Sequence, residues 1–179
     1  MIHENILNQP SVEAERFDLR PLRLSDSGLI GLHLSDARVA LNTSSIPHPL
    51  PPGWVDTMIA RASAEDRAED FWTLDGTRYG GAEVMGVISL TRMDRDQSEV
   101  GYWVAPAFWN TGVASAAVEA LLAANPQEAR TIFASVFQDN AASARVLTNA
   151  GFAYIGDAES FSVARNAKVA TWTYSFKSN

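Results

Sequence analysis

The most constraining feature of this chain is a predicted strand that runs through a glycine turn into an alanine-rich helix, in SEVGYWVAPAFWNTGVASAAVEALLAANP (98–126). Pro106 ends the strand because proline has no backbone N–H to donate to a neighbouring strand. Pro126 ends the helix because the residue before a proline avoids the α region. Gly112 lies between the two elements, and the helix is predicted to start near Val113. Such a unit fits a sheet that is covered by helices.

The glycine turn also predicts a site for an anion. The N–H groups of a first helical turn have no partner within the helix, and with the helix dipole they bind phosphate oxygens without a cationic side chain. Gly112 permits close approach because it has no Cβ, and Ala114 and Ser115 are small. The P-loop triplet Gly-Lys-Ser/Thr and the pattern G-x-G-x-x-G are both absent. A metal-free pyrophosphate therefore fits better than a nucleotide triphosphate, and a purely structural glycine is the competing interpretation.

The rest of the pattern predicts one domain at 15–179 after an N-terminal arm at 1–14. Strands are expected at 16–24, 71–76, 83–93, 98–106, 131–137 and 169–176, and helices at 25–34, 54–62, 113–125 and 139–152. With one further strand before the last, the order is β-α-α-β-β-β-α-β-α-β-β. This order predicts an α+β (mixed α/β) fold, in which helices flank a mixed sheet.

The composition excludes several functions. A formal net charge of −7 and a pI near 4.9 argue against nucleic-acid binding, which needs a basic surface. The lack of cysteine excludes disulfides, cysteine zinc sites and a cysteine acyl-enzyme. The three histidines lack metal-ligand spacing, so we expect no metal. We also expect a cytoplasmic protein without membrane contact, because no secretory signal and no apolar run of roughly 20 residues is visible.

A second predicted helix start lies downstream, in DNAASARVLTNAGF (139–152). Asn140 and Ser143 are both in its first turn, and Asn140 is a suitable N-cap. Gly151 suits the left-handed residue that follows a helix end. A short apolar strand precedes this helix. A second strand-turn-helix unit therefore follows the one at Gly112 in the sequence.

Four segments in this order resemble the GNAT superfamily of acetyl-CoA-dependent N-acetyltransferases. They are FDLRPLRLSDSGLIGLHLSD, SSIPHPL, EVGYWVAPAFWNTGVASAAVEALL and VFQDNAASARVLTNAGF. The likeness is closest to the branch of ribosomal-protein N-terminal acetyltransferases and covers nearly the whole chain. It implies a central, mostly antiparallel twisted sheet, and direct transfer of an acetyl group from acetyl-CoA to a primary amine. A protein N-terminus and a small molecule both offer such an amine, and the protein would act as a monomer or homodimer.

The resemblance also implies which residues contact the coenzyme. These residues are Val104, Ala105, Trp109, Asn110, Thr111, Gly112, Val113, Ala114, Ser115 and Asn140. The turn departs from the family pattern, because Trp109 stands where arginine or glutamine is usual. Asn110 and Thr111 likewise replace what is commonly a glycine and a polar residue.

Two residues are the predicted catalytic groups. Glu99 is the candidate general base, acting directly or through a water, and Glu83 is a weaker one. The competing interpretation of Glu99 is an outward strand residue paired with an arginine. Ser143 occupies a position where relatives carry a hydroxyl near the sulfur of the coenzyme. The competing interpretation of Ser143 is an ordinary first-turn residue that supports the helix cap. Asn140 combines N-cap duty with a coenzyme contact, since its amide has separate donors and acceptor.

A function of a different class stays open on these residues alone. A non-catalytic regulatory module that binds acyl-CoA would keep the glycine turn and would tolerate the loss of Glu99 and Ser143. The acidic composition suits a cationic acceptor but does not identify the amine.

Overall fold

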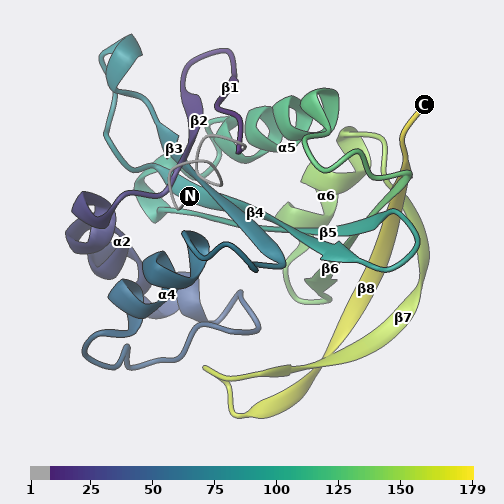
Figure 1. The fold of residues 1–179 in the computed structure, drawn as a ribbon. Helices are drawn as coiled ribbons and strands as arrows, with labels where there is room; N and C mark the ends of the chain where they lie inside the picture. The colour runs from purple at the N-terminus through teal and green to yellow at the C-terminus, as the bar shows by residue number, and fades with distance from the viewer. Residues whose placement is uncertain (1–8) are drawn as a thin grey trace.

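The computed structural model describes residues 9–179, which form one eight-stranded sheet with helices on both faces (Figure 1). The strands are β1 Val12–Glu13, β2 Asp18–Pro21, β3 Glu69–Asp75, β4 Gly86–Met93, β5 Gln97–Val104, β6 Thr131–Phe137, β7 Ala153–Ser162 and β8 Ala167–Lys177. The α-helices are α2 Ser27–Leu34, α3 Ala37–Ala40, α4 Trp54–Ala62, α5 Val113–Ala124 and α6 Ala141–Asn149, and the 3₁₀ turns are η1 Leu24–Asp26, η2 Thr77–Tyr79 and η3 Pro106–Phe108. The predicted fold class is confirmed.

The sheet is antiparallel at every described junction except one. Its strand order is β1-β2-β3-β4-β5-β6-β8-β7, and β5 and β6 are the parallel pair. These two strands pair only where Gln97–Glu99 meets Thr131–Phe133. Beyond Glu99, β5 continues to Val104 and β6 continues to Phe137 without pairing to each other. The two strands therefore diverge, and a gap opens within the sheet.

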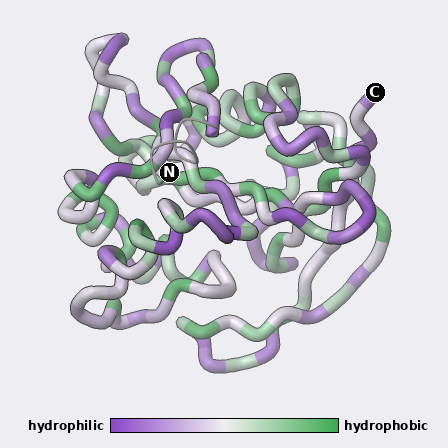
Figure 2. The backbone as a smooth tube through the Cα atoms, viewed as in Figure 1, coloured by the Kyte–Doolittle hydropathy of each residue, from purple (hydrophilic) through white to green (hydrophobic). Residues whose placement is uncertain are grey.

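Two hydrophobic clusters lie on the two faces of the sheet. Alternation along the strands places Trp72, Ile88 and Val100 in the cluster that packs against α5 and α6. Val87 and the partly buried Trp103 belong to the other cluster, which packs against α2, α3 and α4. Figure 2 shows hydrophilic residues gathered in the turns, including those that join β4 to β5 and β7 to β8. Each face of the sheet is therefore covered by its own set of helices. The gap between β5 and β6 opens from one face of the sheet to the other.

A buried ion network fixes β2 to β3 and to the start of the first helical segment. The Arg20 guanidinium donates to Asp26 Oδ2 and Oδ1 at 2.9 and 2.8 Å, and to Asp75 Oδ2 at 2.7 Å. Thr73 Oγ1 donates to Asp26 Oδ2 at 3.1 Å, and Asp26 itself is fully buried. Burial alone would raise the pKa of Asp26, but the hydrogen bonds from Arg20 and from the Arg23 N–H outweigh it and lower that pKa.

The strand predicted at 16–24 is shorter in the structure. It ends at Pro21, and η1 follows, because the Asp26 carboxylate accepts a hydrogen bond from the Arg23 N–H at 2.9 Å and closes the turn. Of the predicted arm at 1–14, residues 1–8 lie outside the described residues. Within the remainder, Val12–Glu13 form the edge strand β1, paired to β2. Within 9–179 no helix is long and apolar enough to cross a membrane.

Candidate active site

The predicted glycine turn is present, and α5 begins where the sequence indicates. Gly112 is the N-cap at φ +83°, a left-handed conformation that favours glycine, and no side chain caps the helix. The Ala116 N–H donates to the Gly112 carbonyl as the first helical bond. The N–H groups of Val113, Ala114 and Ser115 therefore have no partner within the helix and remain available to an anion.

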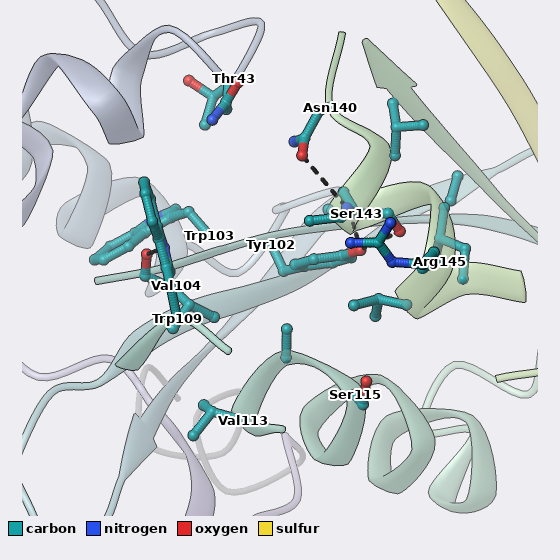
Figure 3. A pocket seen from close by; sticks show the side chains of 18 of the residues that line it. Thr43, Tyr102, Trp103, Val104, Trp109, Val113, Ser115, Asn140, Ser143 and Arg145 are labelled. Carbon is teal, nitrogen blue, oxygen red and sulfur yellow. Dashed lines mark hydrogen bonds between the residues drawn. The ribbon is translucent and has the colours of Figure 1, made fainter. Parts of the chain in front are cut away.

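A cavity of about 480 Å³ lies between the starts of α5 and α6, and we call it the α5–α6 cavity (Figure 3). Nine of the twelve predicted site residues line it: Val104, Trp109, Asn110, Gly112, Val113, Ala114, Ser115, Asn140 and Ser143. Figure 3 shows Val113 and Ser115 of α5 on one side and Asn140 and Ser143 on another. Ala105 and Thr111 are not among its lining residues. Two helix starts far apart in sequence thus face one space.

The backbone of Ala105 is occupied by the protein itself. Its N–H donates to the Met85 carbonyl and its carbonyl accepts from the Phe108 N–H, both at 2.9 Å. The Ala105 N–H is therefore not free to donate to a ligand, and the Ala105 carbonyl already accepts one hydrogen bond. The Val104 carbonyl accepts from Trp109 Nε1 at 2.7 Å, but the alternation of a strand directs the Val104 N–H toward the gap beside β6. Val104 is consequently the residue of this pair that can donate to a bound molecule.

Three side chains of the α5–α6 cavity form a connected group at its centre (Figure 3). The Tyr102 hydroxyl lies 2.7 Å from Ser143 Oγ and 3.3 Å from the Ser143 carbonyl oxygen. Asn140 Oδ1 accepts from the Ser143 N–H at 3.3 Å, which confirms the predicted cap. Burial raises the pKa of Tyr102 to about 12, although the hydrogen bond to Ser143 opposes this shift. Tyr102 therefore keeps its proton at ordinary pH.

A second cavity, of about 500 Å³, lies on the opposite face beside α4, and we call it the α4-side cavity. It shares six lining residues with the α5–α6 cavity: Asn42, Thr43, Gly101, Tyr102, Trp103 and Ser135. Gly101 to Trp103 belong to the part of β5 that has left β6, and Ser135 belongs to the corresponding part of β6. The gap in the sheet is thus the place where the two cavities meet.

Glu99 lines the α4-side cavity and not the α5–α6 cavity. The strand register places Glu69, Thr91 and Glu99 side by side across β3, β4 and β5. Partial burial raises the pKa of Glu99, and the negative charge of Glu69 adds to the effect. Of the competing interpretation, the outward orientation holds, since Glu99 is exposed, but its ion pair with an arginine is absent within residues 9–179. The weaker candidate Glu83 is also exposed and lines neither cavity.

The structure adds site residues that the sequence did not indicate. Arg38 and Arg145 line the α5–α6 cavity, and the Arg38 guanidinium lies 5.7 Å from the centre of the Trp109 ring. Arg16 donates from Nη2 to the Thr111 carbonyl at 2.8 Å. Arg16 and Arg38 come from segments well before the glycine turn in the sequence. Within the described chain, no group of three or more His, Asp or Glu side chains is arranged to hold a metal ion.

The family model of the acetyltransferase (GNAT) domain matches residues 16–153. The chain belongs to the GNAT acetyltransferase family. The match includes both helix starts and the gap between β5 and β6, so the geometry above is that of a GNAT acetyl-CoA-dependent acetyltransferase. The rival expectation of a non-catalytic module finds no support in these comparisons. No curated protein matches the sequence.

Solved GNAT structures share the fold of this chain. The ribosomal-protein α-N-acetyltransferase RimL, in complex with coenzyme A, is 15% identical with a TM-score of 0.80, covering 94% of this chain and 98% of that one. The ribosomal-protein-S5-alanine acetyltransferase from Vibrio fischeri is 20% identical with a TM-score of 0.75, covering 94% and 96%. A chimera of the spermidine N-acetyltransferase SpeG from Vibrio cholerae and hSSAT is 17% identical with a TM-score of 0.70, covering 89% of this chain and 95% of that one.

Proposed function

We propose that the two cavities hold the two substrates of one transfer, with acetyl-CoA in the α5–α6 cavity and a primary amine in the α4-side cavity. The observation that carries this assignment is their junction at Gly101, Tyr102 and Ser135, where β5 and β6 have separated. A thioester that reaches this gap from one face meets an amine from the other. Holding both reactants at one point supplies much of the rate. We propose further that 15–179 acts as a single catalytic domain, because both cavities use strands of the same sheet.

The chemistry follows from which group lies on which face. Glu99 on the acceptor face removes a proton from the amine, directly or through a water, and the neutral nitrogen attacks the thioester carbonyl. The N–H of Val104 faces the gap and donates to the coenzyme. The nitrogen then loses its second proton to a water, and as the tetrahedral intermediate collapses the new amide forms, the C–S bond breaks and the sulfur leaves as a thiolate. Ser143 on the coenzyme face donates a hydrogen bond to that thiolate, and Tyr102 holds the Ser143 hydroxyl in place.

The lining of the α4-side cavity suits an amine that arrives as an ammonium ion. Glu69 and Glu99 supply negative charge, and Trp54, Phe71 and Trp103 supply aromatic walls. The structural neighbours named above act on protein N-termini and on spermidine, and both kinds of acceptor present a primary amine. We therefore propose a cationic primary amine as the acceptor, from a protein N-terminus or a small molecule.

We expect purified protein to release free thiol from acetyl-CoA only when a primary amine is added. The same amines, acetylated beforehand, serve as matched controls and should release none. Coenzyme A alone should raise the thermal midpoint in a concentration-dependent way, because a ligand that binds only the folded state stabilises it. Absence of both the shift at millimolar coenzyme A and the amine-dependent release would refute the proposed function.

The role of Tyr102 can be separated from that of Ser143 by a double-mutant cycle. We expect Tyr102→Phe to lower kcat roughly tenfold, the effect of one lost hydrogen bond, with little change in the KM for acetyl-CoA. Adding Tyr102→Phe to Ser143→Ala should cost nothing further, because Tyr102 acts through the serine hydroxyl. Tyr79→Phe, in an exposed 3₁₀ turn outside both cavities, is the control. Additive losses in the double variant would show that Tyr102 acts independently.

A further inference from the structure

One wall of the α4-side cavity is a stretch of irregular backbone. Residues 42–46 all line this cavity, and we call them the 42–46 wall. Two of them, Asn42 and Thr43, also line the α5–α6 cavity. The wall belongs to the segment 41–53, which joins α3 to α4 and contains neither helix nor strand. No ladder of sheet or helix hydrogen bonds fixes this wall, so its position depends on contacts from other parts of the chain.

The turn of the β7–β8 hairpin makes such contacts with the 42–46 wall (Figure 1). The Val163 N–H donates to the Ser44 carbonyl at 2.9 Å. Arg165 Nε donates to the Leu41 carbonyl at 2.8 Å, a bond between residues 124 positions apart in the sequence. Ala164 packs against the hydrophobic cluster that α2, α3 and α4 cover. A hairpin near the end of the chain thus holds a loop from its first third.

Arg165 also contacts the turn that precedes α6. Its Nη1 and Nη2 donate to Asp139 Oδ2 and Oδ1 at 2.6 and 3.1 Å, which is a bidentate ion pair. Its guanidinium lies 4.7 Å from the centre of the Phe137 ring. Asp139 directly precedes Asn140, the N-cap of α6. One guanidinium therefore connects the hairpin, the 42–46 wall and the start of a helix that lines the α5–α6 cavity.

The turn at 137–140 has its own attachment to the sheet. The Gln138 N–H donates to the Ala170 carbonyl at 3.0 Å, and Gln138 Nε2 donates to the Thr171 carbonyl at 3.1 Å. Both acceptors belong to β8, and neither bond involves Arg165. The turn is therefore the fixed end of the connection, and the irregular 42–46 wall is the end that Arg165 places.

We propose that Arg165 is a positioning residue for the acceptor amine, because it holds the 42–46 wall at a set distance from the start of α6. This role rests on the proposed placement of the amine in the α4-side cavity. Arg165 lines neither cavity, so it acts through the wall and touches neither substrate. Arginine suits the task because its rigid fork of donors reaches Leu41 and Asp139 at once, whereas lysine offers a single point charge.

Steady-state kinetics with spermidine and with trialanine as acceptors tests this role. We expect Arg165→Gln and Asp139→Asn each to raise the KM for the amine roughly tenfold, with little change in kcat or in the affinity for coenzyme A. The double variant should lose no more than either single one, because both changes remove the same connection. Arg165→Lys keeps the charge without the fork and should behave like Arg165→Gln. Arg78→Gln, which breaks an ion pair with Asp18 outside both cavities, is the matched control.

Hydrogen exchange provides a measurement that does not depend on turnover. Backbone amides of 41–46 should exchange faster in Arg165→Gln and in Asp139→Asn than in the wild type, while those of 137–140 and of β5 keep their rates. Unchanged exchange at 41–46 would show that the wall does not need Arg165. Faster exchange throughout the chain would show that Arg165 only stabilises the fold.

The kinetic results can overturn the assignment as well. A fall in kcat with an unchanged KM for the amine would contradict a role in acceptor positioning, and so would full recovery in Arg165→Lys. Failure of the wild-type protein to acetylate either amine would instead count against the proposed function. In that case the exchange rates at 41–46 would still decide whether Arg165 holds the wall.

Discussion

Replacement of Glu99 by glutamine is expected to lower the kcat of amine acetylation by about a hundredfold to a thousandfold, which lies within the typical range of one general-base contribution. The affinity for coenzyme A should change little, because Glu99 lines the α4-side cavity and not the α5–α6 cavity. Glutamine keeps the shape of the side chain and loses only its capacity to accept a proton. Steady-state kinetics with calorimetric binding of coenzyme A measures both quantities. Glu83→Gln is the matched control, since Glu83 is exposed outside both cavities.

The pH profile provides a second measurement on the same variant. The pKa of Glu99 is raised by partial burial and by Glu69, so the carboxylate is deprotonated only above a pH higher than that of an ordinary glutamate. The wild-type rate should therefore rise with pH through this raised pKa, and Glu99→Gln should lose that limb. Glu69→Gln removes a like charge and should move the limb to lower pH. An unchanged rate and profile in Glu99→Gln would leave catalysis to substrate positioning alone.

Asp26→Asn is expected to lower the free energy of unfolding by about 3 kcal/mol, because it removes one partner of a buried ion network and leaves Arg20 less compensated. Urea unfolding followed by circular dichroism measures the loss. Asp36→Asn is the control: Asp36 pairs with Arg38 at an exposed position, and its replacement should change stability little. Equal stability of the Asp26 variant and the wild type would mean that the network carries no net stabilisation.

The network also gives stability a defined dependence on pH. The pKa of Asp26 is lower in the folded protein than its usual value of 3.8, so the unfolded chain binds the proton more readily. The contribution of Asp26 is therefore complete above that usual value and is lost as the pH falls through the lowered folded pKa. The wild-type protein should lose stability over this acid range, and Asp26→Asn should lose less of it. A parallel decline in both proteins would contradict the assignment.

The elements of the fold were predictable from the sequence because their signals are local. Proline at 106 and at 126, together with Gly112, defines a strand end, a helix end and a turn within one short segment. The cap at Asn140 follows from its own neighbours in the same way. Local signals of this kind also identified most residues of the α5–α6 cavity, since the free N–H groups of a helix start lie next to the residues that create them.

The rest of the site depends on contacts that no local pattern encodes. The bond between Tyr102 and Ser143 requires β5 and α6 to meet, and that between Arg16 and Thr111 joins residues 95 positions apart in the sequence. Such pairs follow from strand order and register, which the sequence indicates only weakly. Ala105 shows the converse case, because its N–H donates to the Met85 carbonyl and is not free for a ligand. The local patterns therefore indicated the helix starts that line the α5–α6 cavity and missed partners that are distant in sequence.

The separate walls of the two cavities have an evolutionary consequence. Within 44–61 the cavity-lining residues face the α4-side cavity alone, and they are Ser44, Ser45, Ile46, Trp54, Met58 and Arg61. On the proposed assignment of the two substrates, substitutions in this stretch would alter the preferred amine and leave the donor-binding residues of α5 and α6 unchanged. A duplicated gene would thus encode a protein that still binds and uses acetyl-CoA. Substitutions within 44–61 would then be enough to change the acceptor amine. Lineages of such proteins should accordingly diverge fastest between α3 and the end of α4.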